Sequence, residues 1–260
     1  MLSIIIPVKN EEAMITDCLV SARFADEIIV VDNTSTDATV SMAKSHAAKI
    51  VRTKGADYSQ RKNDGLKAVS PAADWVLFLD ADERIGPLLR QEILQVISRR
   101  STHSAYAIPR QNIFLGQPLF FGGWGNDYVI RLFHKPHLRY WQHPLHEEPV
   151  YTGTLGKLVN PLVHFSHRDL ASMVDKTILF TGHEARLRLE NLHPPVAVWR
   201  FIRVMLSEFW HRFIKLSAWR DGTRGVIDGL FQVFNMFIIY ARLWELQHNP
   251  RLQTSRLIVE

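Results

Sequence analysis

The chain has 260 residues and a formal net charge of +5; hydrophobic residues make up 47% of it and charged residues 22%. This composition excludes a disordered chain and allows a substantial buried core. The single cysteine, Cys18, excludes an internal disulfide and favours a reducing compartment, while the basic charge indicates an anionic partner: a phosphorylated ligand, nucleic acid or an acidic membrane.

The first hundred residues alternate between strand patterns and helical patterns. Short, nearly continuous apolar runs predict buried strands, with helical spacing between them. The strands are expected at 2–7, 27–32, 75–80 and, as a possible fourth, 49–52, and the helices at 11–23, 35–46 and 59–69. This alternation predicts an α/β fold with an open, mostly parallel sheet flanked by helices.

Polar side chains follow the first three predicted strands. Asn10 and Glu11 come after the first, Asp32 ends the second, and Asp80 and Asp82 lie at the end of the third. Ligands of open α/β sheets bind beyond the carboxyl ends of the strands. Two carboxylates one residue apart can hold Mg²⁺ or Mn²⁺, which can bridge to a diphosphate. Capping of the following helix is the alternative role for Asn10, Glu11, Asp80 and Asp82.

Two further positions favour a phosphorylated nucleoside as the ligand. A carboxylate at a buried strand end is costly unless a donor reaches it, and a uracil N3–H would suit Asp32. The segment QRKNDG places Arg61, Lys62 and Asn63 at the start of a predicted helix, where basic groups could reach phosphate. A solvated basic helix face is the alternative, and it suits Arg61 better than the other two.

The segments IPVKNEE, VVDNTSTDAT, QRKNDG and FLDADE, in this order and spacing, resemble the inverting GT-A glycosyltransferases of family 2. The resemblance covers roughly residues 1–170. The segments GWGNDYVIRLFHK, PLHEEP and LVHFSH are most similar to the bacterial lipopolysaccharide inner-core glucosyltransferases. The resemblance implies a GT-A fold, a UDP-sugar donor, a Mg²⁺ or Mn²⁺ ion and inversion at the anomeric carbon.

The resemblance also implies residue roles. The uridine would be held by Pro7, Asn10, Glu11 and Asp32. Asp80 would face the ribose or the diphosphate. The family's basic-Asn pair corresponds to Lys62 and Asn63, and because Arg61 precedes it, either cation could face the phosphate. Asp82 would bind the metal, and His164 is a second candidate ligand because neutral imidazole binds Mn²⁺; a core histidine is the alternative.

An inverting transfer needs a group that takes the proton from the acceptor hydroxyl. Glu147, in HPLHEEP, is the favoured candidate base, and Asp127, in WGNDYVIR, is the second. The alternative for both is a surface ion pair, for example Asp127 with Arg131.

From 106 to 163 the pattern predicts acceptor-side loops and short strands, in which Trp124 and Trp141 are candidate sugar platforms.

The C-terminal region is predicted to be helical. One helix should end near Glu190, and two longer ones should follow Pro194-Pro195. From 196 to 216 basic residues recur among Trp and Phe with helical spacing, which predicts an amphipathic helix. Such a helix suits the headgroup layer of an anionic membrane; packing on the GT-A core or in a dimer is the alternative. The run 226–241 is too short for a spanning helix.

The predicted organisation is a GT-A domain at 1–170 and a helical, basic-aromatic region at 171–260. The domain consists of a nucleotide-sugar half at 1–105 and an acceptor half at 106–170. No signal peptide is predicted at the N-terminus, so we expect a cytoplasmic enzyme, peripheral on the inner membrane.

The expected activity is metal-assisted transfer of a hexose, with glucose suggested by the resemblance, from a UDP-sugar to a saccharide or glycolipid acceptor such as the lipopolysaccharide inner core. The alternatives are a non-catalytic nucleotide-binding or scaffold protein with the same fold, and a family 2 enzyme acting on a polyprenyl phosphate or a protein. An oxidoreductase would need a glycine-rich turn after the first strand, and IPVKNEE has no glycine. No nucleic-acid partner is expected, because the tail's aromatics share a face with aliphatic residues.

Overall fold

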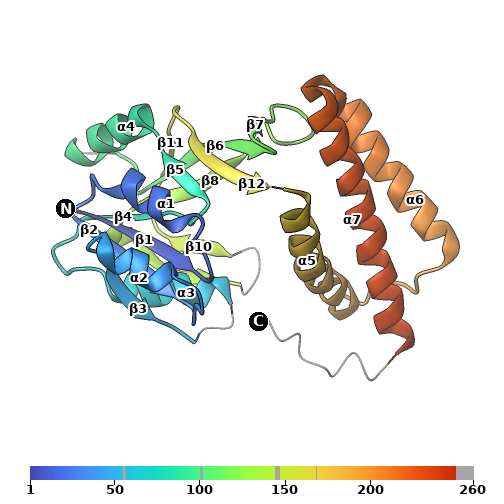
Figure 1. Cartoon of the computed structure of the whole chain (residues 1–260), viewed down its shortest axis with the longest axis horizontal. Coiled ribbons are helices and arrows are strands. Elements are labelled where there is room, and N and C mark those ends of the chain that lie inside the picture. Colours follow the sequence, from blue (N-terminus) through green and yellow to red (C-terminus); the bar gives the residue numbers. More distant parts are fainter. Residues whose placement is uncertain (55–56, 100–101, 144–146, 168, 250–260) are drawn as a thin grey trace. The chain divides into compact units, whose positions relative to one another are not determined.

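The structure is a computed structural model that describes residues 1–54, 57–99, 102–143, 147–167 and 169–249 (Figure 1). The chain forms two compact units. The sheet unit comprises Met1–Gln111 and Asp127–Phe165, and the helical unit comprises Asn112–Asn126 and Ser166–Glu260. The sequence prediction drew a boundary at residue 170 and did not anticipate that a mid-chain segment groups with the C-terminal helices.

The N-terminal half of the sheet unit is parallel, as predicted. The strands β1 to β4 lie in the order β3-β2-β1-β4, and helices connect them. Their bounds are β1 Leu2–Val8, α1 Ile15–Ala22, β2 Glu27–Asp32, α2 Thr39–Ser45, β3 Lys49–Arg52, α3 Tyr58–Lys67 and β4 Trp75–Phe78. Alternate residues of β1, such as Ile4 and Ile5, belong to separate hydrophobic clusters, so this strand is buried on both faces.

Beyond β4 the sheet becomes mixed. Its order continues β8-β6-β12-β5, and the pairs β4 with β8, β6 with β8, and β12 with β5 are antiparallel. The remaining elements before the C-terminal helices are β5 Glu83–Ile85, α4 Pro87–Ser98, β6 Ala105–Phe114, β7 Gln117–Pro118, β8 Tyr128–His134, η1 Lys135–His137, β9 Leu138–Gln142, β10 Glu148–Tyr151, β11 Leu155–Lys157 and β12 Leu162–His167. The predicted α/β, GT-A-type fold with a helical C-terminal region is confirmed.

Helix α3 lies close to the sheet because Gly65 has no side chain. A Cβ atom there would come within 2.5 Å of Ile5 Cγ2 and 2.8 Å of Val31 Cγ2. On the same helix, the Asn63 amide donates to the Trp141 carbonyl at 2.9 Å and accepts from the Trp141 N–H at 2.8 Å. These contacts fix α3 between the parallel strands and β9.

The helical unit consists of three helices with an irregular connection. Its elements are α5 Leu170–Glu190, α6 Val198–Phe209, the π-helical turn η2 Trp210–Lys215, the 3-10 turn η3 Ala218–Asp221 and α7 Gly222–His248. Both α5 and α6 pack along α7. The predicted helix end near Glu190 is confirmed. The prediction of two longer helices was wrong for α6, whose 12 residues are fewer than the 21 of α5, because the π-helical turn interrupts the expected helix.

The segment 112–126 is held by hydrogen bonds inside the helical unit. The Asp221 carboxylate accepts from the backbone N–H groups of Phe120 and Phe121, at 3.0 and 2.8 Å. The indole N–H of Trp124 donates at 2.7 Å to Asp228, which is 1% exposed. Burial raises the pKa of Asp228, against the opposing effect of the Trp124 hydrogen bond. The indole of Trp124 thus binds the segment 112–126 to α7 and packs in the same hydrophobic cluster.

Candidate functional site

The residues predicted to hold the uridine lie around one loop. Asn10, at φ 54°, accepts through its side chain from the Thr36 N–H at 2.8 Å and donates its own N–H to Ser35 Oγ at 2.9 Å. Asp32, 3% exposed, accepts from the Ser35 N–H at 3.1 Å. Pro7 pairs in register with Val31, the neighbour of Asp32. The loop after β2 is therefore fixed from two strand ends.

Glu11 belongs to the same assembly. Its N–H donates to Thr39 Oγ1 at 2.8 Å, at the start of α2. Four residues predicted to bind the sugar donor, Pro7, Asn10, Glu11 and Asp32, thus come from two segments and lie at or just after the carboxyl ends of β1 and β2.

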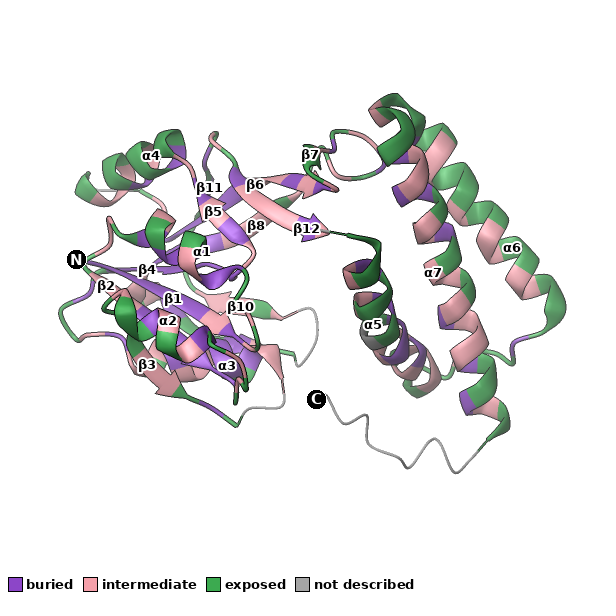
Figure 2. Ribbon diagram, in the orientation of Figure 1, coloured by how far each residue is buried: buried purple, intermediate pink, exposed green. Residues whose placement is uncertain are grey.

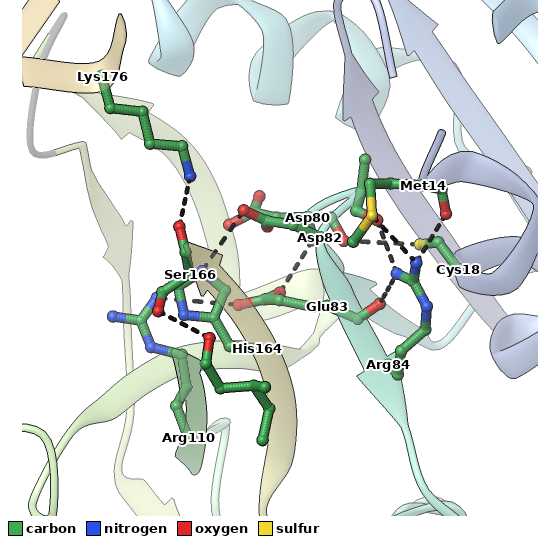
Figure 3. A network of polar contacts seen from close by, with 12 residues as sticks. Met14, Cys18, Asp80, Asp82, Glu83, Arg84, Arg110, His164, Ser166 and Lys176 are labelled. Atoms are coloured by element: carbon green, nitrogen blue, oxygen red, sulfur yellow. Dashed lines mark hydrogen bonds and ion pairs between the residues drawn. The ribbon is translucent and has the colours of Figure 1, made fainter. Parts of the chain in front are cut away.

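An acidic cluster follows β4, where Asp80, Asp82 and Glu83 lie close to His164 (Figure 3). Glu83 is fully buried, and its carboxylate accepts from the Asp80 N–H at 2.9 Å. Arg131 of β8, 5% exposed, donates to Asp80 and, at 3.2 Å, to Glu83. One guanidinium group thus bridges two carboxylates beneath the strand end.

The two carboxyl groups bound by Arg131 respond differently to burial. Burial opposes ionisation of Asp80, but Arg131 and then Lys62 outweigh it, so the pKa of Asp80 lies below its ordinary value. For Glu83, burial outweighs Arg131, and its pKa lies above its ordinary value. Burial disfavours the charge of Arg131, yet Asp80, Glu83 and Glu147 raise its pKa. Asp80 is therefore a fixed anion of this site.

Lys62 holds the favoured candidate base. Its ammonium group is 2.5 Å from Glu147 Oε1 and 4.1 Å from the centroid of the Trp141 ring, and the residue is 2% exposed. Burial, together with the nearby Arg131, lowers the pKa of Lys62, while Asp80 and Glu147 oppose that effect. The cation that the sequence suggested for phosphate contact thus orients a carboxylate whose side chain is 20% exposed.

Asp82 and His164 form a candidate metal pair. Strands β5 and β12 pair so that Glu83 lies opposite His164. The Nε2 atom of His164 is 3.5 Å from Asp82 Oδ2, and the two side chains are 15% and 26% exposed. Within the described residues, no three His, Cys, Asp or Glu side chains group closely enough to enclose a metal ion.

A pair of protein ligands nevertheless fits the chemistry of the expected ion. Mg²⁺ commonly keeps water and substrate phosphates in its coordination shell, and Mn²⁺ accepts both carboxylate and imidazole. Asp82 and His164 supply one group of each kind at a partly open position. The site therefore suits an ion whose remaining ligands come from a diphosphate and water.

Asp127 has a different partner from the one that the sequence suggested. It accepts two hydrogen bonds from Arg110, from Nε at 2.8 Å and from Nη2 at 3.1 Å. The suggested ion pair with Arg131 was wrong, because Arg131 faces the buried carboxylates after β4. A bidentate arginine pair holds Asp127 in one orientation, whereas Glu147 contacts the buried network through Lys62.

Sequence reasoning missed Arg131 and Glu83 as parts of this site. The available signal was an arginine inside the apolar run VIRLF, since a charge in a buried strand requires a buried partner. The solvated face proposed for Arg61 was also wrong: this residue is 5% exposed, with its guanidinium 4.8 Å from the centroid of the Tyr58 ring.

Comparisons with known proteins agree on a class of enzyme. The family model described as glycosyl transferase family 2 matches residues 3–174. An uncharacterized glycosyltransferase of Rickettsia typhi is 28% identical, over 96% of this chain and 89% of its own. The lipopolysaccharide core biosynthesis glycosyltransferase LpsC of Rhizobium meliloti is 23% identical, over 91% of this chain and 89% of its own.

Among solved structures, glucosyl-3-phosphoglycerate synthase from Mycobacterium tuberculosis, in complex with Mn²⁺, UDP and glucosyl-3-phosphoglycerate, matches with a TM-score of 0.44 at 16% identity. The match covers 66% of this chain and 74% of that one.

Proposed function

Because this chain belongs to glycosyltransferase family 2, we propose that it is an inverting transferase that moves a hexose, glucose in the first instance, from a UDP-sugar to a saccharide acceptor. One observation carries the proposal: Lys62 contacts the candidate base Glu147, and the charges of Lys62 and Asp80 lie near enough to shift each other's pKa. This proximity supports a donor phosphate site and a proton acceptor that lie close together.

On this proposal the donor lies over the carboxyl ends of β1, β2 and β4. Asp32 accepts from the uracil N3–H, and Pro7, Asn10 and Glu11 complete the nucleoside site. Asp80 faces the ribose and diphosphate, with Lys62 and Asn63 beneath. Asp82 and His164 hold Mg²⁺ or Mn²⁺, which when bound neutralises charge on the departing UDP.

Glu147 then takes the proton from the acceptor hydroxyl as that oxygen attacks the anomeric carbon. The bond between that carbon and the UDP oxygen breaks in the same step, which inverts the configuration. Lys62 acts as a positioning residue, because its contact at 2.5 Å fixes one oxygen of the Glu147 carboxylate.

The name of a relative supports the proposed acceptor class. LpsC is a lipopolysaccharide core biosynthesis enzyme by name, which supports a core saccharide as the acceptor here. Such an acceptor is lipid-linked, so we place the enzyme at the cytoplasmic face of the inner membrane.

A panel of UDP-sugars, with and without Mn²⁺, tests the proposal. We expect release of UDP only with acceptor and metal present, and heat of donor binding by calorimetry. Asp82→Ala should abolish turnover. Glu147→Gln should bind the donor normally and lose about 10²- to 10⁴-fold in kcat, the usual contribution of a general base.

Two results would contradict parts of this assignment. If folded wild-type protein bound no UDP-sugar with either metal, a scaffold role would replace the transferase. If Glu147→Gln transferred sugar normally, Asp127 would become the base, with Asp127→Asn as its direct test.

A further inference from the structure

The outer face of α6 carries an uninterrupted row of large apolar side chains. This α6 stripe consists of Trp199, Ile202, Leu206 and Phe209 of α6, together with Trp210, the first residue of η2. Spacings of three and four residues place them on one side of the helix. Each is between 43% and 65% exposed, and Figure 2 shows most of α6 as exposed.

Packing inside the helical unit uses a different side of α6. Phe201 contacts Phe237 of α7 in a tilted arrangement, with ring centroids 5.7 Å apart, and it joins a cluster that contains Leu243. Within the stripe, Phe209 stacks on Phe213 of η2 with ring centroids 4.6 Å apart, yet it and the other four side chains keep 43% or more of their surface exposed. A contiguous exposed apolar surface marks an interaction site.

The exposed charged residues between 196 and 224 are basic. They form a basic flank of Arg203, Lys215, Arg220 and Arg224. Arg220 also lies over the Phe121 ring, and Arg224 donates to the Leu115 carbonyl. Arg200 and Arg203 also lie over the Trp199 ring, 4.6 and 5.8 Å from its centroid. Aromatic rings beside cations are the composition of helices in an anionic headgroup layer.

Every acidic side chain between residues 191 and 244 has an internal partner. Glu208 pairs with Arg212 at 2.6 Å, Asp221 accepts from the segment 112–126, and Asp228 is buried. No carboxylate in this range is exposed. Between these two positions the exposed charged side chains are therefore basic, and the exposed carboxylates that flank the range are Glu190 and Glu245. An excess of exposed cations attracts anions.

We propose that the α6 stripe and the basic flank dock the protein on an anionic phospholipid bilayer, with α6 parallel to the membrane plane. This deepens the proposed function, since a lipid-linked acceptor would be met at that surface. A second copy is a poorer occupant, because an isologous contact would bring the same uncompensated cations together.

The contacts that α7 makes with its neighbours also argue against a membrane-spanning role for this helix. The segment Ala218–His248 is long and apolar enough to cross a bilayer, and 28% of its most apolar window is buried. Yet α7 provides Asp228, which binds Trp124 and Gln232, and both neighbouring helices pack against it. It serves as the central packing helix of this unit.

Vesicle flotation of the full-length protein tests the docking surface. We expect the protein to float with vesicles of phosphatidylcholine plus phosphatidylglycerol, with about tenfold or more weaker partitioning onto phosphatidylcholine alone. Because exposed charges are screened by salt, binding should fall severalfold between about 0.1 and 0.5 M NaCl.

The matched variants exchange exposed helical apolar residues for glutamine. The triple variant Trp199→Gln, Ile202→Gln, Leu206→Gln should lose about tenfold or more in partitioning. The control Val20→Gln, Leu88→Gln, Leu94→Gln changes exposed positions on α1 and α4 and should float like wild type. Arg203→Glu with Lys215→Glu should weaken binding to the anionic vesicles alone.

Three outcomes would overturn docking: no flotation of the wild type, equal loss in the stripe and control variants, or retention on vesicles after an alkaline carbonate wash, which indicates a spanning helix. A wild-type dimer that the stripe variant converts to a monomer, without flotation, would identify a second copy as the occupant. Turnover on delipidated core saccharide separates the two proposals. The stripe variant should keep this turnover, because membrane docking is not part of the transfer reaction. If the transferase assignment failed, the wild type would show no turnover but would still float with vesicles.

Discussion

Lys62 has a nearly fully buried ammonium group whose bonding partner is a carboxylate. Substitution by methionine keeps the side chain's length and removes its charge. We expect kcat to fall about 10- to 100-fold, because Glu147 loses the contact that orients it. The affinity for UDP-sugar should change less than kcat. Steady-state kinetics with calorimetry would measure both.

Rescue by the conservative variant separates positioning from a general loss of structure. Lys62→Arg keeps a cation that can contact the Glu147 carboxylate, so it should restore part of the kcat that Lys62→Met loses. Equal losses of kcat in both variants, together with a fall in the midpoint of unfolding, would assign Lys62 a structural role only.

Asp64 illustrates a carboxylate that stabilises α3 from its surface side. It accepts from Thr53 Oγ1 at 2.7 Å, Gln60 Nε2 at 2.8 Å and Lys67 Nζ at 3.1 Å. Burial raises the pKa of Asp64, but these hydrogen bonds outweigh that effect and the pKa is lowered. A lowered folded-state pKa adds stability above the ordinary carboxyl range, which is lost as pH falls through the folded value.

Asp64→Asn should therefore cost about 1 kcal/mol of unfolding free energy at pH 7. The difference from wild type should shrink at acid pH, as the pH falls through the lowered folded-state pKa of Asp64. Urea midpoints at the two pH values measure it. Asp17→Asn, at an exposed position on α1, is the control; an unchanged difference at the lower pH would contradict the linkage.

Helix α3 can lie close to the sheet because residue 65 is a glycine. Gly65→Ala should lower the unfolding free energy by about 1 to 3 kcal/mol, since the new methyl group overlaps Ile5 and Val31. Thermal unfolding measures the loss. Gly86→Ala is the matched control, because a Cβ atom at Gly86 would meet nothing within 4 Å. Similar shifts for both variants would argue against close packing at α3.

Sequence patterns located the parallel strands best. Two predicted ranges, 27–32 and 49–52, coincide with β2 and with the edge strand β3, because short apolar runs between helical segments have few other structures to form. The predicted short strands and loops at 106–163 missed β6, which is ten residues long. Its polar C-terminal part, with Arg110, Gln111 and Asn112, breaks the apolar alternation on which such predictions depend.

The candidate site was predictable only where its residues follow strands. Asp32, Asp80 and Asp82 come at strand ends, so topology alone brings them to one edge. The contact of Lys62 with Glu147 joins residues 85 positions apart, and no local pattern specifies such a pairing. The prediction of the partner of Asp127 was wrong for the same reason. Arg110 and Arg131 are both nearby in sequence, and only the register of the strands determines which of them contacts Asp127.

The division of the molecule predicts how it responds to truncation. A chain ending at residue 165 retains segment 112–126 but lacks the helices that cover it, which exposes Phe114 and Leu119, now 0% and 2% exposed. We expect this fragment to aggregate.

A second fragment provides the control. Pro109 and Tyr128 pair across the hairpin of β6 and β8, so a short Asn-Gly turn can replace 112–126. That version should be soluble and monomeric by size-exclusion chromatography. Equal aggregation of both fragments would mean that the sheet unit depends on the helices in some other way.

The pairing of β5 with β12 has a consequence during synthesis on the ribosome. Asp82 emerges long before Glu147 and His164, so a nascent chain can complete the parallel strands β1 to β4 while it still lacks half of the candidate metal pair and the candidate base. On the proposed assignment, the two candidate groups are complete only after β12 has been translated and has paired with β5.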